Sequence, residues 1–172
     1  GIEKTHGNNQ YVVKQGEKQV LVAKDGTEIL KEGYDKIAEI LNLSENGIIF
    51  VKRNKYGVMK TSGEVAIEAF YDDLKEAKSG LFIAKQNGKY GIIDLQKSEK
   101  VAFKYESISY NEKADIYVAT KADFSEDILN SNFEIKQTGI LVELNEEKGY
   151  LALRQNDETK YYNFKFEEKN VK

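Results

Sequence analysis

The chain has no cysteine, no proline and no tryptophan, and its single histidine is His6. Without thiols it can have no disulfide framework, no Cys-ligated zinc or iron–sulfur site and no thiol nucleophile. One histidine close to the N-terminus is a poor basis for a multi-His metal site or a Ser–His–acid triad. The sequence therefore predicts no metal and no cofactor.

Arginine is also scarce: lysine outnumbers it 24 to 2, and the net charge is −3. Arginine is the better bidentate ligand for bases and phosphates, and a negative chain has no global attraction to nucleic acid. The most basic patch is Lys52, Arg53, Lys55 and Lys60, which we interpret as a solvated turn. We predict no nucleic-acid partner.

Long apolar runs are missing as well. No run approaches the roughly 18 residues of a membrane-spanning helix, so no membrane span is expected within this chain. The chain begins Gly1-Ile2 without a methionine. This start indicates N-terminal trimming, with an upstream signal or anchor removed, and favours an extracytoplasmic or cell-surface location.

What the sequence does contain is internal self-similarity. A lysine, a tyrosine and a glycine open two segments 34 residues apart, 55–59 (KYGVM) and 89–93 (KYGII). A second tyrosine follows 15 residues after the first in each copy, and the same spacing leads upstream from Gln19 to another tyrosine. The late tyrosines of the three copies are Tyr34, Tyr71 and Tyr105. Three copies in register predict a tandem repeat of about 35 residues.

Glycines, acids and apolar runs keep the same register. The corresponding glycines are Gly26 with Gly63 and Gly57 with Gly91, and the acids after the late tyrosines are Asp35, Asp72 and Glu106. Short runs such as 48–51 (IIFV) and 81–84 (LFIA) are rich in β-branched and aromatic residues, which indicates strands. Asn87-Gly88 is a strong hairpin signal, because both residues tolerate the positive φ of a type I′ turn.

These features predict a single all-β domain of 172 residues, built from tandem three-stranded repeats in an open curved array. A small or partial propeller-like arrangement is the alternative. The expected divisions are an N-terminal tail (1–9), repeats at 10–46, 47–79 and 80–115, and an atypical capping unit at 116–172.

Two segments fit helical patterns instead. Asp123 and Glu126 match a capping box, which predicts one short helix near 124–131. A helical turn also fits the spacing of Ile37, Ile40, Leu41 and Leu43.

The repeats resemble the WG (or KWG) β-repeat family, which occurs in bacterial proteins and is of uncharacterised function. The residues that carry the resemblance are 88–94 (GKYGIID) and 54–59 (NKYGVM), the latter continuing to Tyr71-Asp72. Tyr56 and Tyr90 occupy the slot where the family has tryptophan. The resemblance covers about residues 10 to 120 and implies a fold, without a particular chemistry.

The tyrosines are the candidate binding residues. Tyr56 and Tyr90, with Tyr71 and Tyr105, are predicted to form a ladder that stacks on a ligand. The competing interpretation is packing inside each repeat, because recurrence at one position per repeat is first a packing requirement. Gly26, Gly63, Gly57, Gly91 and Tyr34 are interpreted as structural repeat positions, with Gly57 and Gly91 allowing a close backbone approach or a bulge.

Three functions remain open. The leading hypothesis is a non-enzymatic interaction module that presents an extended β surface to a protein or a cell-envelope polymer. A glycan hydrolase needs two carboxylates, and Asp72 and Glu106 occupy equivalent positions one repeat apart. The third hypothesis is a structural spacer or assembly domain.

Overall fold

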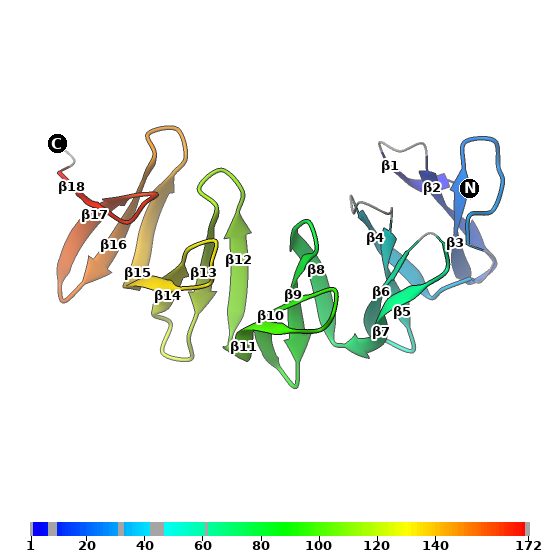
Figure 1. Cartoon of the computed structure of the whole chain (residues 1–172), viewed down its shortest axis with the longest axis horizontal. Coiled ribbons are helices and arrows are strands. Elements are labelled where there is room, and N and C mark those ends of the chain that lie inside the picture. Colours follow the sequence, from blue (N-terminus) through cyan, green and yellow to red (C-terminus); the bar gives the residue numbers. More distant parts are fainter. Residues whose placement is uncertain (1, 7–9, 31–32, 42–46, 61, 171–172) are drawn as a thin grey trace. The chain divides into compact units, whose positions relative to one another are not determined.

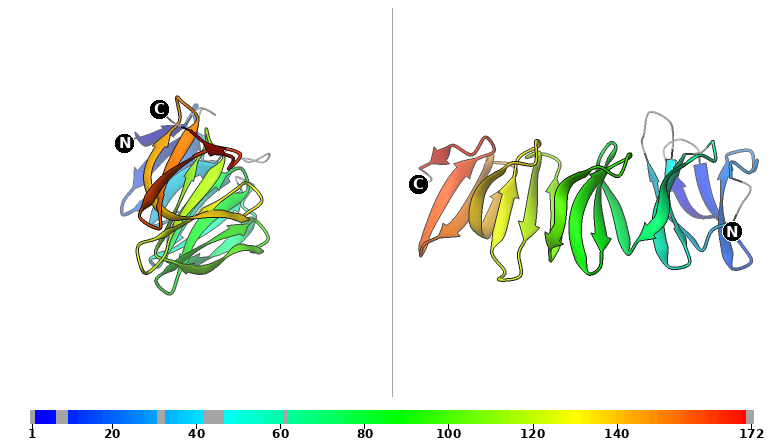
Figure 2. Two further views of the ribbon diagram at one scale, coloured as in Figure 1. Left: turned by 90° about the vertical axis from the view of Figure 1, so that its left-hand side faces the viewer. Right: turned by 60° about the horizontal axis from the view of Figure 1, so that its bottom comes forward.

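A computed structural model describes residues 2–6, 10–30, 33–41, 47–60 and 62–170 (Figure 1). Throughout these residues the regular elements are β-strands, so this part of the chain contains no helix, and none that could cross a membrane. The predicted all-β class is confirmed. Figure 2 shows that the sheets are twisted, as expected of strands built from L-residues.

The described strands form four sheets in which sequence neighbours pair. The first two sheets are β1 (Ile2–His6), β2 (Gln10–Gln15) and β3 (Lys18–Ala23), then β4 (Lys36–Leu41), β5 (Gly47–Lys52), β6 (Lys55–Lys60) and β7 (Val65–Tyr71). The third is β8 (Asp73–Lys78), β9 (Leu81–Gln86), β10 (Lys89–Asp94) and β11 (Glu99–Tyr105). The fourth is β12 (Ser107–Asn111), β13 (Ile116–Thr120), β14 (Glu126–Leu129), β15 (Ile135–Asn145), β16 (Tyr150–Gln155), β17 (Glu158–Asn163) and β18 (Glu168–Lys169).

The chain divides into two compact units. The N-terminal unit is Gly1–Asn87 with Ile93–Glu99, and the C-terminal unit is Gly88–Ile92 with Lys100–Lys172. Each unit has its own apolar core. The core of the first includes Leu21, Ile48 and Phe50, and the core of the second includes Ile116, Ile128 and Leu151. In the first unit the core side chains come from the first and second sheets, which bury their faces against each other, and in the second unit they come from strands of the fourth sheet.

Tight hairpins connect the strands where the sequence predicts them. Asn87 (φ 51°) and Gly88 (φ 80°) both have positive φ, which is the type I′ geometry. Arg53 and Asn54 adopt the same conformation between β5 and β6, and Asn156 and Asp157 adopt it between β16 and β17. These turns set the register of each hairpin.

The number of strands per repeat differs from the prediction of three. The second and third sheets each have four strands, because a strand precedes each predicted triplet. In the second sheet this strand is β4, so the helical turn at Ile37, Ile40 and Leu41 was a wrong prediction; Leu43 lies outside the described residues. The pairing of β4 with β5 contains a bulge between Ile37 and Glu39.

The helix predicted near 124–131 is also wrong, because Glu126–Leu129 is strand β14 and pairs with β13 and β15. The side chain of Asp123 does accept a backbone hydrogen bond, from the N–H of Ser125 at 2.9 Å. It therefore closes a turn between two strands, where the sequence pattern suggested a helix cap.

Strand β15 belongs to two sets of strand pairs. Its first part pairs with β14, with Gly139 opposite Glu126, and its second part pairs with β16, with Ile140 opposite Arg154. The change of partner falls at Gly139, where an added Cβ would lie 2.7 Å from the carbonyl oxygen of Arg154. A glycine is needed at this point because the two backbones approach too closely for any side chain.

Candidate functional site

The two Tyr-Gly pairs occupy equivalent positions in the structure. Tyr56 and Tyr90 are both the second residue of their strand, and both are half-buried. A Cβ on Gly57 would lie 2.5 Å from the carbonyl oxygen of Ile67, and one on Gly91 would lie 2.6 Å from that of Val101. Close backbone approach therefore accounts for both glycines, and the half-buried tyrosines beside them keep part of each ring exposed.

The late tyrosines lie in the cores. Tyr34, Tyr71 and Tyr105 have 3%, 5% and 1% of their surface exposed. The Tyr34 hydroxyl donates to the sulfur of Met59 at 3.1 Å, and burial raises the pKa of Tyr71. Buried rings cannot stack on a ligand, so Tyr71 and Tyr105 are packing residues, and the prediction of a binding role remains only for Tyr56 and Tyr90.

A lysine–acid ion pair recurs once per repeat, which the sequence reasoning missed. The pairs join the lysine before the aromatic slot to the acid after the late tyrosine: Lys18–Asp35, Lys55–Asp72 and Lys89–Glu106. Asp35 also accepts from the backbone N–H of Arg53 at 2.8 Å. The constant separation of 17 residues between lysine and acid was the signal in the sequence.

These pairs bear on the carboxylates considered for hydrolysis. The hydrogen bond from Lys18 lowers the pKa of Asp35, and the hydrogen bond from Lys55 lowers the pKa of Asp72. A glycosidase general acid needs a raised pKa. Among the described residues no group of three or more His, Asp or Glu side chains is placed to hold a metal ion.

The same tight turn closes several hairpins along the chain. Its first residue donates to the carbonyl of the residue four positions on, and the fourth residue donates back to the first and has positive φ. The fourth residues include Gly26, Gly63, Phe124, Phe133 and Phe166. Glycine takes this conformation freely, whereas phenylalanine is strained in it.

The three phenylalanines differ in what their rings contact. Phe133 packs on Tyr117 with ring centroids 5.5 Å apart, and Phe166 packs against the core of the C-terminal unit. Phe124 is 80% exposed. Strain of this kind without local packing is a feature of functional sites, so Phe124 is a candidate contact residue.

The buried carboxylate of Asp127 on β14 links β11 and β15. Asp127 is 5% exposed, and it accepts from the Tyr105 hydroxyl at 2.7 Å and from Thr138 Oγ1 at 2.8 Å. Lys121 Nζ lies 3.6 Å from Oδ1, the oxygen that also accepts from Thr138. Burial raises the pKa of Asp127, but the hydrogen bonds from Tyr105 and Thr138 and the Lys121 charge outweigh burial and hold it below its ordinary value. The carboxylate stays ionised and supports the sheet.

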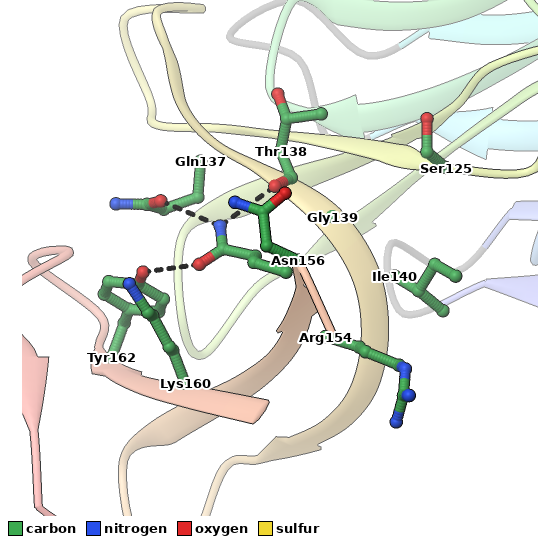
Figure 3. Close-up of a pocket in the computed structure, with 10 residues that line it drawn as sticks. Ser125, Gln137, Thr138, Gly139, Ile140, Arg154, Asn156, Lys160 and Tyr162 are labelled. Atoms are coloured by element: carbon green, nitrogen blue, oxygen red, sulfur yellow. Dashed lines mark hydrogen bonds between the residues drawn. The ribbon is translucent and has the colours of Figure 1, made fainter. Parts of the chain in front are cut away.

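A polar hollow of about 480 Å³ lies where β15 changes partner (Figure 3). It is lined by Ser125, Gln137, Thr138, Gly139, Ile140, Arg154, Gln155, Asn156, Lys160 and Tyr162. Hydrogen bonds hold the lining residue Gln155 in place: its amide donates to Thr138 O at 2.9 Å and to Gln137 Oε1 at 3.1 Å, while Tyr162 donates to Gln155 Oε1 at 2.7 Å. This volume is in the range of ligand sites.

The charged residues of the hollow are both cations, Arg154 from β16 and Lys160 from β17. Figure 3 shows Lys160 beside Tyr162 on one side of the hollow, and Arg154 below Ile140 on the opposite side. Arg154 lies 3.6 Å from Asp157, which is 99% exposed. In the described chain Lys160 has no ion-pair partner. Neither cation recurs with the repeat, and for that reason the search for repeated residues did not single them out.

Exposed apolar side chains border this hollow. Ile140 and Val142 on β15 are 51% and 59% exposed, and Phe124 directly precedes the lining residue Ser125. Large apolar side chains grouped next to convergent polar groups mark interaction surfaces more often than isolated ones do.

Part of the repeat region matches a known family of repeats. The profile described as "WG containing repeat" matches residues 56–90, which supports a WG-type repeat in this part of the chain. A search of curated proteins gave no match.

Solved structures similar to this chain include Kluyveromyces lactis Hsv2 with loop 6CD replaced by a Gly-Ser linker, with a TM-score of 0.58 and 13% identity over 95% of this chain and 63% of that chain. The C-terminal WD40 domain of Sif2 has a TM-score of 0.51 and 11% identity, covering 98% and 56%. A eukaryotic initiation factor has a TM-score of 0.56 and 12% identity, covering 94% and 50%. The chain spans only about half to two thirds of the length of these structures.

At these identities the likeness concerns the fold. Four-stranded antiparallel sheets in sequence order are the blades of WD40 propellers, and the likeness agrees with the propeller-like alternative.

Proposed function

We propose that this chain is a non-enzymatic interaction module whose partner is a protein, bound on the surface around the polar hollow of the C-terminal unit. The observation that carries the proposal is the exposure of Ile140 and Val142 on β15, beside a hollow large enough for a side chain and its neighbours. A WD40-like fold supports this assignment, because such folds present rigid strands and turns to partners.

The hydrolase hypothesis has less support. The described aspartates whose pKa departs from its ordinary value, Asp72 and Asp127 among them, are all shifted downward. A general acid in a glycosidase must hold its proton near neutral pH, which requires the opposite shift. The ion pair Lys55–Asp72 gives that carboxylate a structural partner instead.

A phage-displayed library of random peptides tests the proposal. Peptides selected on the immobilised wild-type chain are expected to lose binding to Val142→Asp, because the added charge disrupts an apolar contact. The matched control is Val65→Asp, which changes a 38% exposed valine on β7 in the N-terminal unit and should leave binding unchanged. If no enriched peptide distinguishes the two variants, the interaction surface lies elsewhere and the proposal is wrong.

A further inference from the structure

We infer that the hollow at Gly139 receives a tyrosine side chain of the partner protein, inserted between β15 and the β16–β17 hairpin. The inference rests on the proposed function and names the residue type that the hollow recognises. It comes from a comparison within the chain. Beside the corresponding hairpin of the N-terminal unit, a tyrosine of the chain itself fills the equivalent position, whereas here the position is open.

Strand register makes the β16–β17 hairpin the counterpart of the β5–β6 hairpin. Each consists of two six-residue strands joined by two residues with positive φ. The cross-strand pairs also match: Phe50–Gly57 corresponds to Leu153–Lys160, and Ile48–Met59 corresponds to Leu151–Tyr162. The surroundings of the two hairpins can therefore be compared position by position.

Beside the β5–β6 hairpin the position is filled by Tyr34, which is 3% exposed. The ring centroid of Tyr34 lies 5.2 Å from that of Phe50, and the Tyr34 hydroxyl donates to Met59 Sδ at 3.1 Å. Tyr34 stands two residues before the first residue of β4, and Tyr71 and Tyr105 stand likewise before β8 and β12. A buried tyrosine thus precedes the first strand of the second, third and fourth sheets.

The β16–β17 hairpin has no such tyrosine. Ile140 is the counterpart of Lys36, because each pairs with the second-last residue of the strand that leads into its hairpin. Two residues before Ile140 stands Thr138, whose hydroxyl donates to Asp127 at 2.8 Å, and Gly139 between them has no side chain. The chain itself therefore supplies no ring at this position.

The hollow lies where this ring is missing. Two of its lining residues, Lys160 and Tyr162, are the counterparts of Gly57 and Met59. Its volume of about 480 Å³ is larger than that of a tyrosine side chain. A tyrosine of a second protein would therefore complete the packing that Tyr34 completes beside the first hairpin.

The hydroxyl of Tyr162 is placed to receive a phenol. It donates its hydrogen to Gln155 Oε1 at 2.7 Å, so its oxygen keeps lone pairs that can accept a hydrogen bond (Figure 3). An inserted tyrosine can donate to this oxygen, just as Tyr34 donates to the sulfur of Met59.

Other lining side chains favour a residue that is both aromatic and polar. The ammonium of the half-buried Lys160 can lie against the face of an aromatic ring. The side-chain amides of Gln137 and Asn156 add polar groups to the lining, and Ile140 adds an apolar one. Tyrosine combines a large apolar surface with one hydroxyl and is frequent at the centres of protein interfaces.

N-acetyltyrosinamide, with N-acetylphenylalaninamide as the matched probe, tests the inference on the full chain by amide NMR shifts. The tyrosine probe at millimolar concentration is expected to shift the amides of Gly139, Gln155 and Tyr162. The phenylalanine probe should shift the same amides but bind about fivefold more weakly, because it lacks one hydrogen bond.

Two pairs of variants locate the site. Tyr162→Phe should lose most of the preference for the tyrosine probe, whereas Tyr161→Phe, whose ring lies against Tyr150 on the other face of β17, should keep it. Lys160→Tyr places a ring of the chain itself in the hollow and should abolish binding of both probes. Thr159→Tyr, on the other face of the same strand, should bind them as wild type.

The phage-selected peptides separate this inference from the proposed function. They are expected to contain a tyrosine whose replacement by alanine weakens binding more than about tenfold. Peptides that lose binding to Val142→Asp but bind Lys160→Tyr as wild type would leave the interaction module standing and reject the tyrosine site.

Two further results overturn the inference. Equal shifts by the tyrosine probe in wild type and Lys160→Tyr would mean that the probe binds elsewhere. If no selected peptide is sensitive to Val142→Asp while Lys160→Tyr still abolishes probe binding, the proposed function fails and the hollow is assigned to a small phenolic molecule instead of a protein.

Discussion

The same turn is closed in two ways in the two regions of this chain. In the repeats it has Gly26, Gly63 and Lys97 at the left-handed position, and in residues 116–172 it has Phe124, Phe133 and Phe166. Phenylalanine is strained there, yet for Phe133 and Phe166 the ring packs against the core and offsets the strain. Two of the three C-terminal turns therefore add a ring to the packing, which the glycine turns of the repeats cannot do.

The acidic residues of the two regions also differ in their burial and in their partners. In the repeats Asp35, Asp72 and Glu106 form surface ion pairs with lysines. In the C-terminal region Asp127 is buried and holds Tyr105 and Thr138 by hydrogen bonds. Exposed pairs contribute little to stability, but a buried acceptor with buried donors is costly to remove.

The largest expected effect tests this second contrast. Asp127→Ala should lower the free energy of unfolding by about 3 kcal/mol, because the buried Tyr105 hydroxyl loses its acceptor. Asp72→Ala, which removes an exposed acid, should cost much less. Urea unfolding of the two variants measures the difference, and similar losses would remove the distinction between the regions.

Both regions contain a glycine that lies close to the backbone of another strand, and replacing it is expected to cause the next largest loss of stability. Gly91→Ala and Gly139→Ala place a Cβ 2.6 and 2.7 Å from a backbone oxygen, so each should destabilise the fold by about 2 kcal/mol. Gly63→Ala is the control: no atom lies within 4 Å of its Cβ, and only the positive φ opposes it, at about 1 kcal/mol. Chemical denaturation that ranks Gly63→Ala as the worst of the three would contradict the close-approach account.

Acid pH tests the buried carboxylate of Asp127. The pKa of Asp127 is lowered in the folded state, so its contribution to stability is present above about pH 4 and disappears as the pH falls through the folded-state value. Wild type should therefore lose more stability than Asp127→Asn between about pH 4 and pH 2. Thermal unfolding at a series of pH values measures this, and parallel curves for the two proteins would show that Asp127 is not perturbed.

The smallest effect has the opposite sign. Phe124→Gly should stabilise the chain by about 0.5–1 kcal/mol, because it relieves backbone strain at an 80% exposed side chain. Phe133→Gly should destabilise it, since the ring contact with Tyr117 is lost. If Phe124→Gly is instead destabilising in a calorimetric melt, the ring has a packing role and is not held ready for a ligand.

Much of the fold follows from local patterns. Register, strand content and the type I′ turn at Asn87-Gly88 could be predicted because each depends on residues close in sequence. Strand β4 could not, since the bulge between Ile37 and Glu39 breaks the alternation of the strand and gives its apolar residues helix-like spacing. The Asp123 side chain accepts a backbone hydrogen bond, and a helix N-cap and a turn both use such a bond. The pairing of β14 with β15 decides that the following residues form a strand, and this pairing is not visible in the local sequence.

The candidate site was less accessible to sequence reasoning. Recurrence drew attention to Tyr71 and Tyr105, but residues that recur in every repeat are those that pack, and both are buried. Arg154 and Lys160 occur once, on the two strands of the β16–β17 hairpin, where Arg154 lies opposite Thr159 and Lys160 lies opposite Leu153. The hollow that they line forms where β15 changes its partner strand at Gly139, which the period of the repeat does not contain.

The shared strand β15 also constrains how this chain can vary in length. Repeat arrays gain and lose whole modules when a boundary between two modules can be cut without damage to either. A deletion that ends between Gly139 and Ile140 would take one strand from β14 and leave β16 with an open edge prone to aggregation. We therefore expect the two sets of strands joined by β15 to be duplicated, deleted or transferred to another protein only as one unit.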